Sequence, residues 1–170
     1  SKGVDVWTEG QVTLLNDTLE VYSTSNTPAI IGTNDATDDC IVFSDGIALK
    51  KITMSGDTET TSTYTVSPAQ ATDTFVSITT DGTRYFAACD SGIYVGLTSG
   101  ATTDGVINAV GTDDVIVKFV KQRLMAGVSN AIYELNPNTT PSATLPGAAL
   151  PTPEFTHPSS TWTWTSICEG

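Results

Sequence analysis

The chain has 170 residues, of which 39% are hydrophobic and only 15% are charged, and this length is enough to form one well-buried core or two small ones. Its polar character comes from Thr, Ser, Asn and Asp, which favour strands and turns over helices. The 7 basic and 19 acidic residues give a net charge of −12 and leave no cluster of Lys and Arg to bind a phosphate backbone. We therefore expect an acidic all-β protein with no nucleic-acid partner.

Two further absences narrow the class of protein. No apolar stretch approaches the roughly 20 residues of a transmembrane helix, so no membrane insertion is expected. The start, Ser1–Val6, lacks the apolar segment of a signal peptide, and the protein is expected to be soluble. The cysteines Cys40, Cys89 and Cys168 are odd in number and lack metal-ligand spacing, so we expect buried, reduced thiols and no metal or other cofactor.

The chain reads as a series of repeated units. A partial unit covers residues 1–28, where Val12–Leu15 and Leu19–Tyr22 flank a turn and predict one hairpin. The next unit, residues 29–70, is complete. Its expected strands and its turn are Ala29–Ile31, Cys40–Phe43, the turn Ser44–Gly46, Ile47–Leu49 and, as a candidate fourth strand, Thr61–Val66.

The same pattern returns twice more. The unit at residues 71–111 contains Phe75–Ile78, Arg84–Cys89, the turn Asp90–Gly92, Ile93–Leu97 and the candidate fourth strand Val106–Val110. The unit at residues 112–158 contains Val115–Val117, Leu124–Val128, the turn Ser129–Asn130, Ala131–Tyr133 and the candidate fourth strand Ser142–Leu145. The proline-rich residues 137–158 are expected to form an extended surface loop.

A further unit starts at residues 159–170, where Trp164–Ile167 aligns with Phe75–Ile78. Four strands in about 40 residues is the size of a propeller blade, so the repeats predict a β-propeller or a propeller fragment of four-stranded antiparallel units within a single repeat domain, residues 1–170. Two arrangements are open. Either the strand near Trp162–Ile167 completes the first unit and closes a small ring, or the blades continue in a longer protein. The stop at Cys168–Gly170, in mid-unit, favours the second.

Two stretches carry a resemblance to a known family. Leu124–Leu135 resembles a blade hairpin of tail-associated structural proteins of tailed bacteriophages. Phe155–Pro158 and Trp162–Gly170 are similar to minor tail proteins of phages that infect actinobacteria. The likeness covers roughly residues 75–170. It implies a virion protein near the tail tip, whose partners are other tail proteins and a glycan or protein of the host surface, and it implies no catalytic motif.

Candidate chemistry is sparse. Trp162 and Trp164 are two residues apart, so a strand would place both indoles on one face, either to stack on a sugar or to pack between blades. His157, the only histidine, lies in the proline-rich loop, and Ser129 lies in a turn, so neither is expected to be catalytic. The groups Asn34-Asp35, Asp38-Asp39 and Asp113-Asp114 are interpreted as solvated loops, with calcium binding as the alternative.

The sequence thus favours a non-enzymatic role. The first hypothesis is a structural virion protein of a phage tail that mediates assembly contacts, with host attachment as an additional role. The alternative is a glycan-binding or glycan-processing β-propeller module that uses Trp162 and Trp164. A third possibility, an interaction scaffold of the Trp-Asp or kelch type, lacks the signature of either family.

Overall fold

The structure is a computed structural model that describes residues 4–5, 13–14, 28–35, 38–55, 58–70 and 72–168. These residues form strands, turns and extended segments and contain no helix, which confirms the all-β prediction. They form three four-stranded antiparallel sheets and one short two-stranded pair. We call the four-stranded sheets the first, second and third sheet in chain order.

Each four-stranded sheet is built from consecutive strands. The first sheet contains β3 (Ala29–Thr33), β4 (Asp39–Asp45), β5 (Ala48–Ser55) and β6 (Thr58–Thr63). The second contains β7 (Ser77–Thr80), β8 (Arg84–Cys89), β9 (Gly92–Leu97) and β10 (Gly105–Asn108). The third contains β11 (Val115–Val120), β12 (Arg123–Val128), β13 (Ala131–Leu135) and β14 (Phe155–Thr156).

The N-terminal pair joins β1 (Val4–Asp5) to β2 (Thr13–Leu14). The hairpin predicted from Val12–Leu15 and Leu19–Tyr22 lies largely outside the described residues.

The central hairpins follow the turn signals of the sequence. The turn Asp90–Ser91 joins β8 to β9, and the turn Ser129–Asn130 joins β12 to β13. In the first sheet the hairpin is longer than predicted, because the ladder continues to the pair Asp45 and Ala48 and the turn falls at Gly46–Ile47. Gly46 has a φ of 63°, the left-handed conformation that glycine adopts without steric cost.

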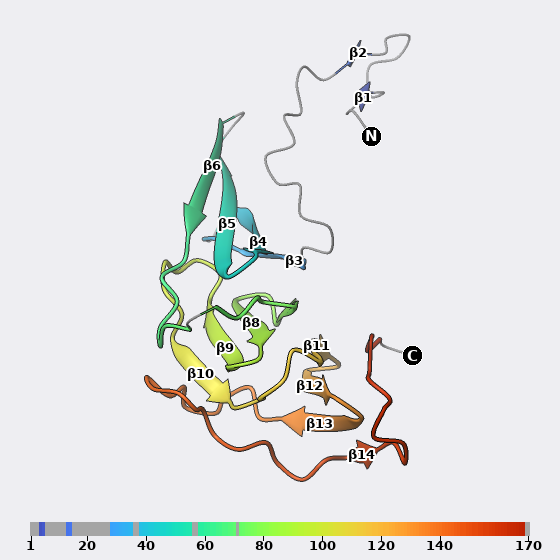
Figure 1. Cartoon of the computed structure of the whole chain (residues 1–170). Helices are drawn as coiled ribbons and strands as arrows, with labels where there is room; N and C mark the ends of the chain where they lie inside the picture. The colour runs from blue at the N-terminus through green and yellow to red at the C-terminus, as the bar shows by residue number, and fades with distance from the viewer. Residues whose placement is uncertain are drawn as a thin grey trace.

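The sheets stack face to face in chain order (Figure 1). The second sheet lies in the middle, and every residue from Tyr85 to Cys89 and from Gly92 to Gly96 is buried. One of its faces packs on the first sheet through a core that includes Val42, Leu49 and Tyr94. The other packs on the third sheet through a core that includes Phe86, Ile93 and Leu124. A sheet covered on both faces is apolar along its whole length, and β8 and β9 have this composition.

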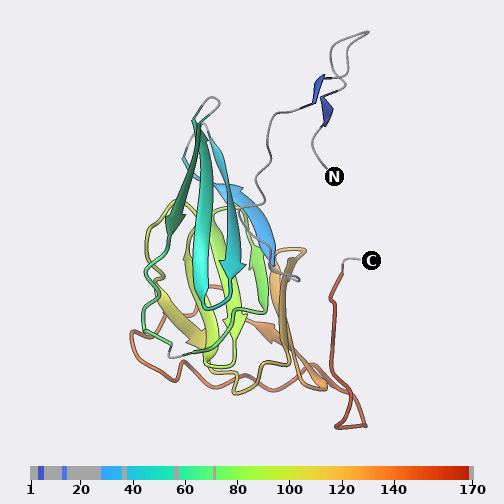
Figure 2. The same cartoon turned by 45° about the horizontal axis from the view of Figure 1, so that its top comes forward.

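The first strands of the three sheets lie along one side of the stack, where β7 contacts both β3 and β11 (Figure 2). Hydroxyl groups close the contact between β7 and β11. The Ser77 Oγ accepts a hydrogen bond from the Val117 backbone N–H at 3.0 Å, and the Thr79 Oγ1 accepts one from the Phe119 N–H at 2.8 Å. These side chains satisfy backbone donors of β11 that would otherwise lack partners at this strand edge.

Two predicted strands were wrong, Ser142–Leu145 and the segment Trp162–Ile167, whose residues form no strand. Ser142–Leu145 is not the fourth strand of the third sheet; β14 takes that place. Ser142 instead exchanges two backbone hydrogen bonds with Val106 of β10, at 2.8 and 3.1 Å, and Ala148 bonds the same edge through Ala109 and Ile107. The frequent prolines of this stretch lack the N–H groups that a continuous ladder needs. The stretch therefore bonds the edge of the second sheet at isolated residues and forms no strand there.

The predicted fourth strands of the first two sheets exist but begin earlier than expected. β6 begins at Thr58 where the sequence predicted Thr61, and β10 begins at Gly105 where it predicted Val106.

Two tyrosines in the first core provide a test of this packing. Tyr64 and Tyr85 pack edge to face with ring centroids 5.0 Å apart. The Tyr64 hydroxyl donates to the Thr98 carbonyl at 2.7 Å, whereas the buried Tyr85 hydroxyl has no hydrogen-bond partner among the described residues. The two rings therefore lie in the same core, but only the Tyr64 hydroxyl has a hydrogen-bond partner.

We expect Tyr64→Phe to lower the free energy of unfolding by about 1–2 kcal/mol, because it removes a buried hydrogen bond. Tyr85→Phe should leave that free energy unchanged or raise it, because it removes an unpaired buried hydroxyl. Urea denaturation of the two variants and the wild type measures both effects. Equal losses in the two variants would contradict the difference between the hydroxyls.

Candidate functional site

The C-terminal residues fold back on the turn between β12 and β13. The His157 backbone N–H donates to the Asn130 carbonyl at 2.8 Å, and the Asn130 side-chain amide donates to the His157 carbonyl, also at 2.8 Å. The Trp162 N–H then donates to the Ser159 carbonyl at 3.4 Å, and the Trp164 N–H to the Ser129 carbonyl at 3.2 Å. The chain therefore reverses between His157 and Trp162 and returns to the same turn.

This reversal brings four aromatic side chains together in two pairs. Phe155 and Trp164 meet edge to face with centroids 6.0 Å apart, and His157 and Trp162 stack at 4.4 Å with an interplanar angle of 20°. We call Phe155, His157, Trp162 and Trp164 the aromatic clasp. Trp162 is 61% exposed and Phe155 is 50% exposed. The clasp presents the large apolar surface that sugar-binding and protein-binding sites share.

The two tryptophans have different surroundings. Residues 162–167 form no strand, so the strand geometry that predicted both indoles on one face does not apply. Trp164 lies against the third sheet, where a Cβ added to Gly127 would approach the Trp164 Cβ to 2.9 Å. Its indole Nε1 is buried and has no hydrogen-bond partner among the described residues. Trp164 therefore packs on a sheet, while Trp162 offers an exposed ring.

The clasp does not form a catalytic arrangement. The His157 Nδ1 accepts a hydrogen bond from the Ser159 backbone N–H at 3.1 Å, which orients the ring. Ser129 occupies a turn with a φ of 50°, and within the described ranges no hydrogen bond joins its hydroxyl to His157. A nucleophile and its base need such a bond.

The buried thiols are also poor nucleophiles. Cys40 and Cys89 are buried and unpaired, and Cys168 is exposed. Burial is the main cause that raises the pKa of Cys89, to about 11, and burial likewise raises the pKa of Cys40. Because the thiolate is the reactive form, both side chains stay unreactive at neutral pH.

The part of the chain that the structure describes holds no group of three or more His, Cys, Asp or Glu side chains placed to bind a metal ion. The same part contains no helix that is long and apolar enough to cross a membrane.

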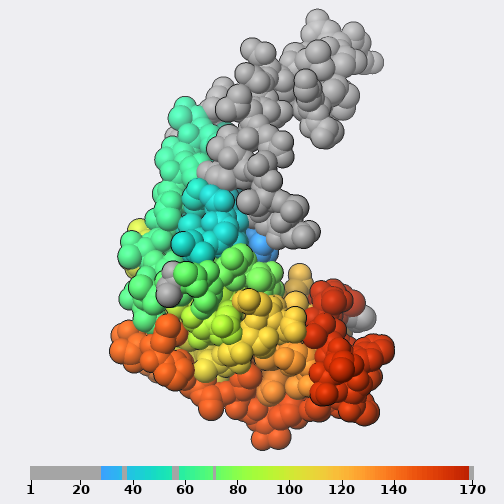
Figure 3. Space-filling model, viewed as in Figure 1, coloured from blue at the N-terminus to red at the C-terminus, as the bar shows by residue number. Residues whose placement is uncertain are grey.

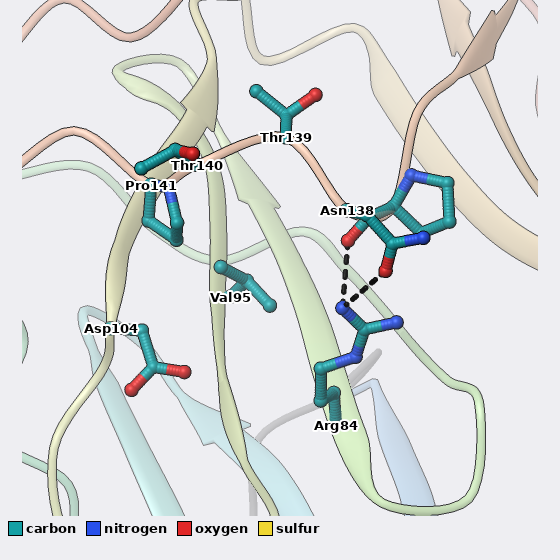
Figure 4. Close-up of a pocket in the computed structure, with 8 residues that line it drawn as sticks. Arg84, Val95, Asp104, Asn138, Thr139, Thr140 and Pro141 are labelled. Atoms are coloured by element: carbon teal, nitrogen blue, oxygen red, sulfur yellow. Dashed lines mark hydrogen bonds between the residues drawn. The ribbon is translucent and has the colours of Figure 1, made fainter.

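An open pocket of about 400 Å³ lies elsewhere, between the second sheet and residues 137–141 (Figure 4). Arg84 of β8 lines the pocket, together with Val95 of β9 and Asp104, which directly precedes β10. The Arg84 Nη1 donates to the Pro137 carbonyl at 2.8 Å and to the Asn138 Oδ1 at 3.3 Å. On its other side the guanidinium pairs with Asp81 at 2.8 Å. The bonds to Pro137 and Asn138 hold the loop, and the pair with Asp81 orients the guanidinium that makes them.

The surroundings of Asp81 favour the charged carboxylate that pairs with Arg84. Burial of its carboxyl raises the pKa, but hydrogen bonds from the Arg84 and Thr83 backbone N–H groups and from the Arg84 guanidinium outweigh burial and lower the pKa overall. The sequence alone does not reveal the link between Arg84 and the loop at residues 137–141. Its only local signal is an Asp-x-x-Arg spacing across a turn, and the partner loop is more than fifty residues away in sequence, which no local pattern reveals.

No protein-family model matches the chain, and it has no match among curated proteins or among solved structures. Evidence for the function therefore comes from the chain's own residues.

We expect Arg84→Met to release residues 137–141, because each hydrogen bond from a charged group contributes about 1.5–3 kcal/mol to stability. Amide hydrogen exchange at Thr139 and Thr140 should accelerate roughly tenfold or more. Arg123→Met is the matched control, because Arg123 forms an exposed ion pair with Glu134 at 3.0 Å and does not contact this loop. Unchanged exchange in Arg84→Met would show that the loop is held by other contacts.

Proposed function

We propose that the chain is part of a β-propeller that serves as a structural protein of a bacteriophage tail. Its blades would contact other tail proteins, and its exposed surface would contribute to attachment to the host. The proposal assigns the chain no catalytic activity and no cofactor. It places the protein in the virion, within a larger assembly.

The arrangement of the sheets supports the propeller. In a propeller each blade is a four-stranded sheet whose first strand lies nearest the central axis. Here the first strand β7 contacts the first strands β3 and β11, and successive sheets pack face to face. The incoming segment of each following unit also bonds the preceding hairpin turn: Phe75 N–H to the Gly46 carbonyl, Gly111 N–H to Asp90, and Trp164 N–H to Ser129. This contact supports the proposal that Trp164–Ile167 begins a further blade.

The observation that carries the tail assignment concerns the two stretches that resemble tail proteins. Leu124–Leu135 forms β12, β13 and their turn, and Phe155–Cys168 forms β14 and the C-terminal segment. Hydrogen bonds between Asn130 and His157 join them, so both stretches form one surface. A likeness spread over two distant segments is more informative when the segments meet in space.

The charge of the surface is consistent with this role. A net charge of −12 keeps the chain soluble at high local concentration and disfavours contact with nucleic acid. Binding in an assembly then depends on the apolar and aromatic patches described above.

The test is to raise an antibody against this chain and to probe density-purified particles from its native source. We expect the protein to co-purify with tailed particles, and peptide mass spectrometry of the particle band should recover β12 and β13. Immunogold labelling should decorate the distal tail. Recovery of the protein only from the particle-free fraction would contradict the assignment.

Trp162 favours one second candidate function, the binding or processing of a glycan. Its indole is 61% exposed and supported from below by His157 at 4.4 Å, the geometry of a stacking platform for a sugar ring.

If the platform binds a sugar, the wild-type chain should give signal on a glycan array, and Trp162→Ala should lower affinity about tenfold or more, since an aromatic stacking contact contributes on the order of 1–1.5 kcal/mol beyond burial. Leu97→Ala, at an exposed apolar residue of β9, is the control and should bind normally. A glycan-release assay separates binding from processing. If the wild type neither binds on the array nor releases a glycan, this candidate function is excluded.

A further inference from the structure

The first sheet has an exposed apolar row on the face that points away from the second sheet. Ile31, Ile41 and Ile52 are direct neighbours across β3, β4 and β5. Ile31 is 68% exposed and Ile41 is 43% exposed, and Met54 beside them is 50% exposed. We call Ile31, Ile41 and Ile52 the isoleucine row. A contiguous patch of this kind on a sheet face usually marks a binding surface.

The other two sheets have rows of paired residues in their first three strands on the face turned toward the preceding sheet. They are Ile78, Ala87 and Tyr94 in the second sheet and Val117, Ala126 and Tyr133 in the third. In the second sheet this row is buried against the first sheet, and in the third sheet it packs against the second. The isoleucine row therefore lies on the face of the first sheet that corresponds to the face by which each later sheet packs on the sheet before it.

The third sheet lies at the opposite end of the stack from the first sheet (Figure 3). On the third sheet, the face that points away from the second sheet carries the row Lys118, Met125 and Glu134. Arg123 extends from the same face and pairs with Glu134 at 3.0 Å. The C-terminal segment lies next to this row, where Thr165–Ile167 line a shallow groove with Ile116 and Lys118. This face corresponds to the one through which the first and second sheets each receive their successor.

Charged side chains of opposite sign lie near the same end of the strands on the two open faces. Asp39 and Glu59 line the groove that contains the isoleucine row, at the end where β3 leads into β4. Lys118 and Arg123 flank the equivalent turn, between β11 and β12. Because Thr33 at the end of β3 donates its N–H to Gly82 in the turn between β7 and β8, the sheets keep these ends aligned. A continued stack would bring the acidic pair against the basic pair.

We propose that the isoleucine row of one chain docks on the outer face of the third sheet of a second copy of this chain, continuing the stack head to tail. The interface joins two different surfaces, so it is heterologous and closes into a ring or grows into a filament, depending on the rotation between copies. Trp164–Ile167 would lie within the interface at the side of the first strands. The inference rests on the proposed assembly function and names its partner.

The test is sedimentation of the purified full chain over a concentration series. We expect reversible association, and Ile41→Asp should weaken it about a hundredfold, since it places a charge in an apolar contact. Leu145→Asp is the control: Leu145 is exposed but lies on neither face, and the variant should associate like the wild type. Thermal unfolding of each variant checks that the fold is retained.

A charge exchange makes the test specific. The double variants Asp39→Lys with Glu59→Lys, and Lys118→Glu with Arg123→Glu, should each lose association at least tenfold, because like charges then meet. An equal mixture of the two double variants should restore it, since each altered face then meets a face of opposite charge. Failure of the mixture to associate would overturn the pairing of these faces.

Two other results would also overturn the proposal. One is a wild type that stays monomeric at every concentration. The other is a monomer whose thermal stability falls strongly in Ile41→Asp, which would assign the row to an occupant within the same chain. Neither result depends on whether the protein is found in tail particles, so failure of this inference is distinct from failure of the proposed function.

Discussion

The structure depends on the burial of both faces of the second sheet. A sheet of four short strands buries too little surface to be stable when one of its faces is open to water. Small side chains at Ala87 and Ala88 on β8 let the neighbouring sheets approach closely on both sides, and large rings at Tyr94 and Phe86 fill the spaces beside them. The first and third sheets are each stabilised on one face by this central layer.

Polar groups enter the contacts between sheets only where they are paired. Lys51 is nearly buried between the first and second sheets, yet its ammonium donates to the carbonyls of Ser99 and Gly100 at 3.0 and 3.1 Å and to the Asn34 side chain at 3.2 Å. The Thr98 hydroxyl lies nearby and donates to a carbonyl of β3 at 2.6 Å. An unpaired lysine at this depth would cost several kcal/mol. These bonds fix the relative position of the sheets, which apolar contacts alone would leave free to slide.

Local patterns in the sequence predicted the parts of the fold that local physics determines. Apolar alternation and the turn pairs at Asp90–Ser91 and Ser129–Asn130 located the central hairpins, because a tight turn sets the register of both flanking strands. The turn of the first sheet was misplaced, because Ser44–Asp45 resembles a turn by composition but continues the ladder in the structure. Composition identifies residues that can form a turn. It does not show how many strand pairs form before the turn begins.

Non-local contacts explain the remaining errors. Ser142–Leu145 has the composition of a strand, but the open edge of β10 bonds Ser142 and leaves the third sheet to pair with Phe155–Thr156. The sequence singled out Trp162 and Trp164 as a pair on one strand face, but their surroundings depend on where the chain reverses after His157. The pocket near Arg84 depends on a loop that arrives from a later unit. In each case the deciding partner is distant in sequence.

The first sheet keeps an uncovered apolar face, and the direction of the repeat explains why. Segments from later in the chain cover other surfaces: residues 142–148 cover the edge of β10, and Trp164 covers part of the third sheet. The face with the isoleucine row points toward the beginning of the repeat, so later units pack away from it. Its edge strand β6 is exposed at every residue, with Thr, Ser and Glu side chains that favour solvation. Polar residues thus protect the edge from pairing while the face stays apolar, which is the combination expected where a neighbour stacks on a sheet and does not extend it.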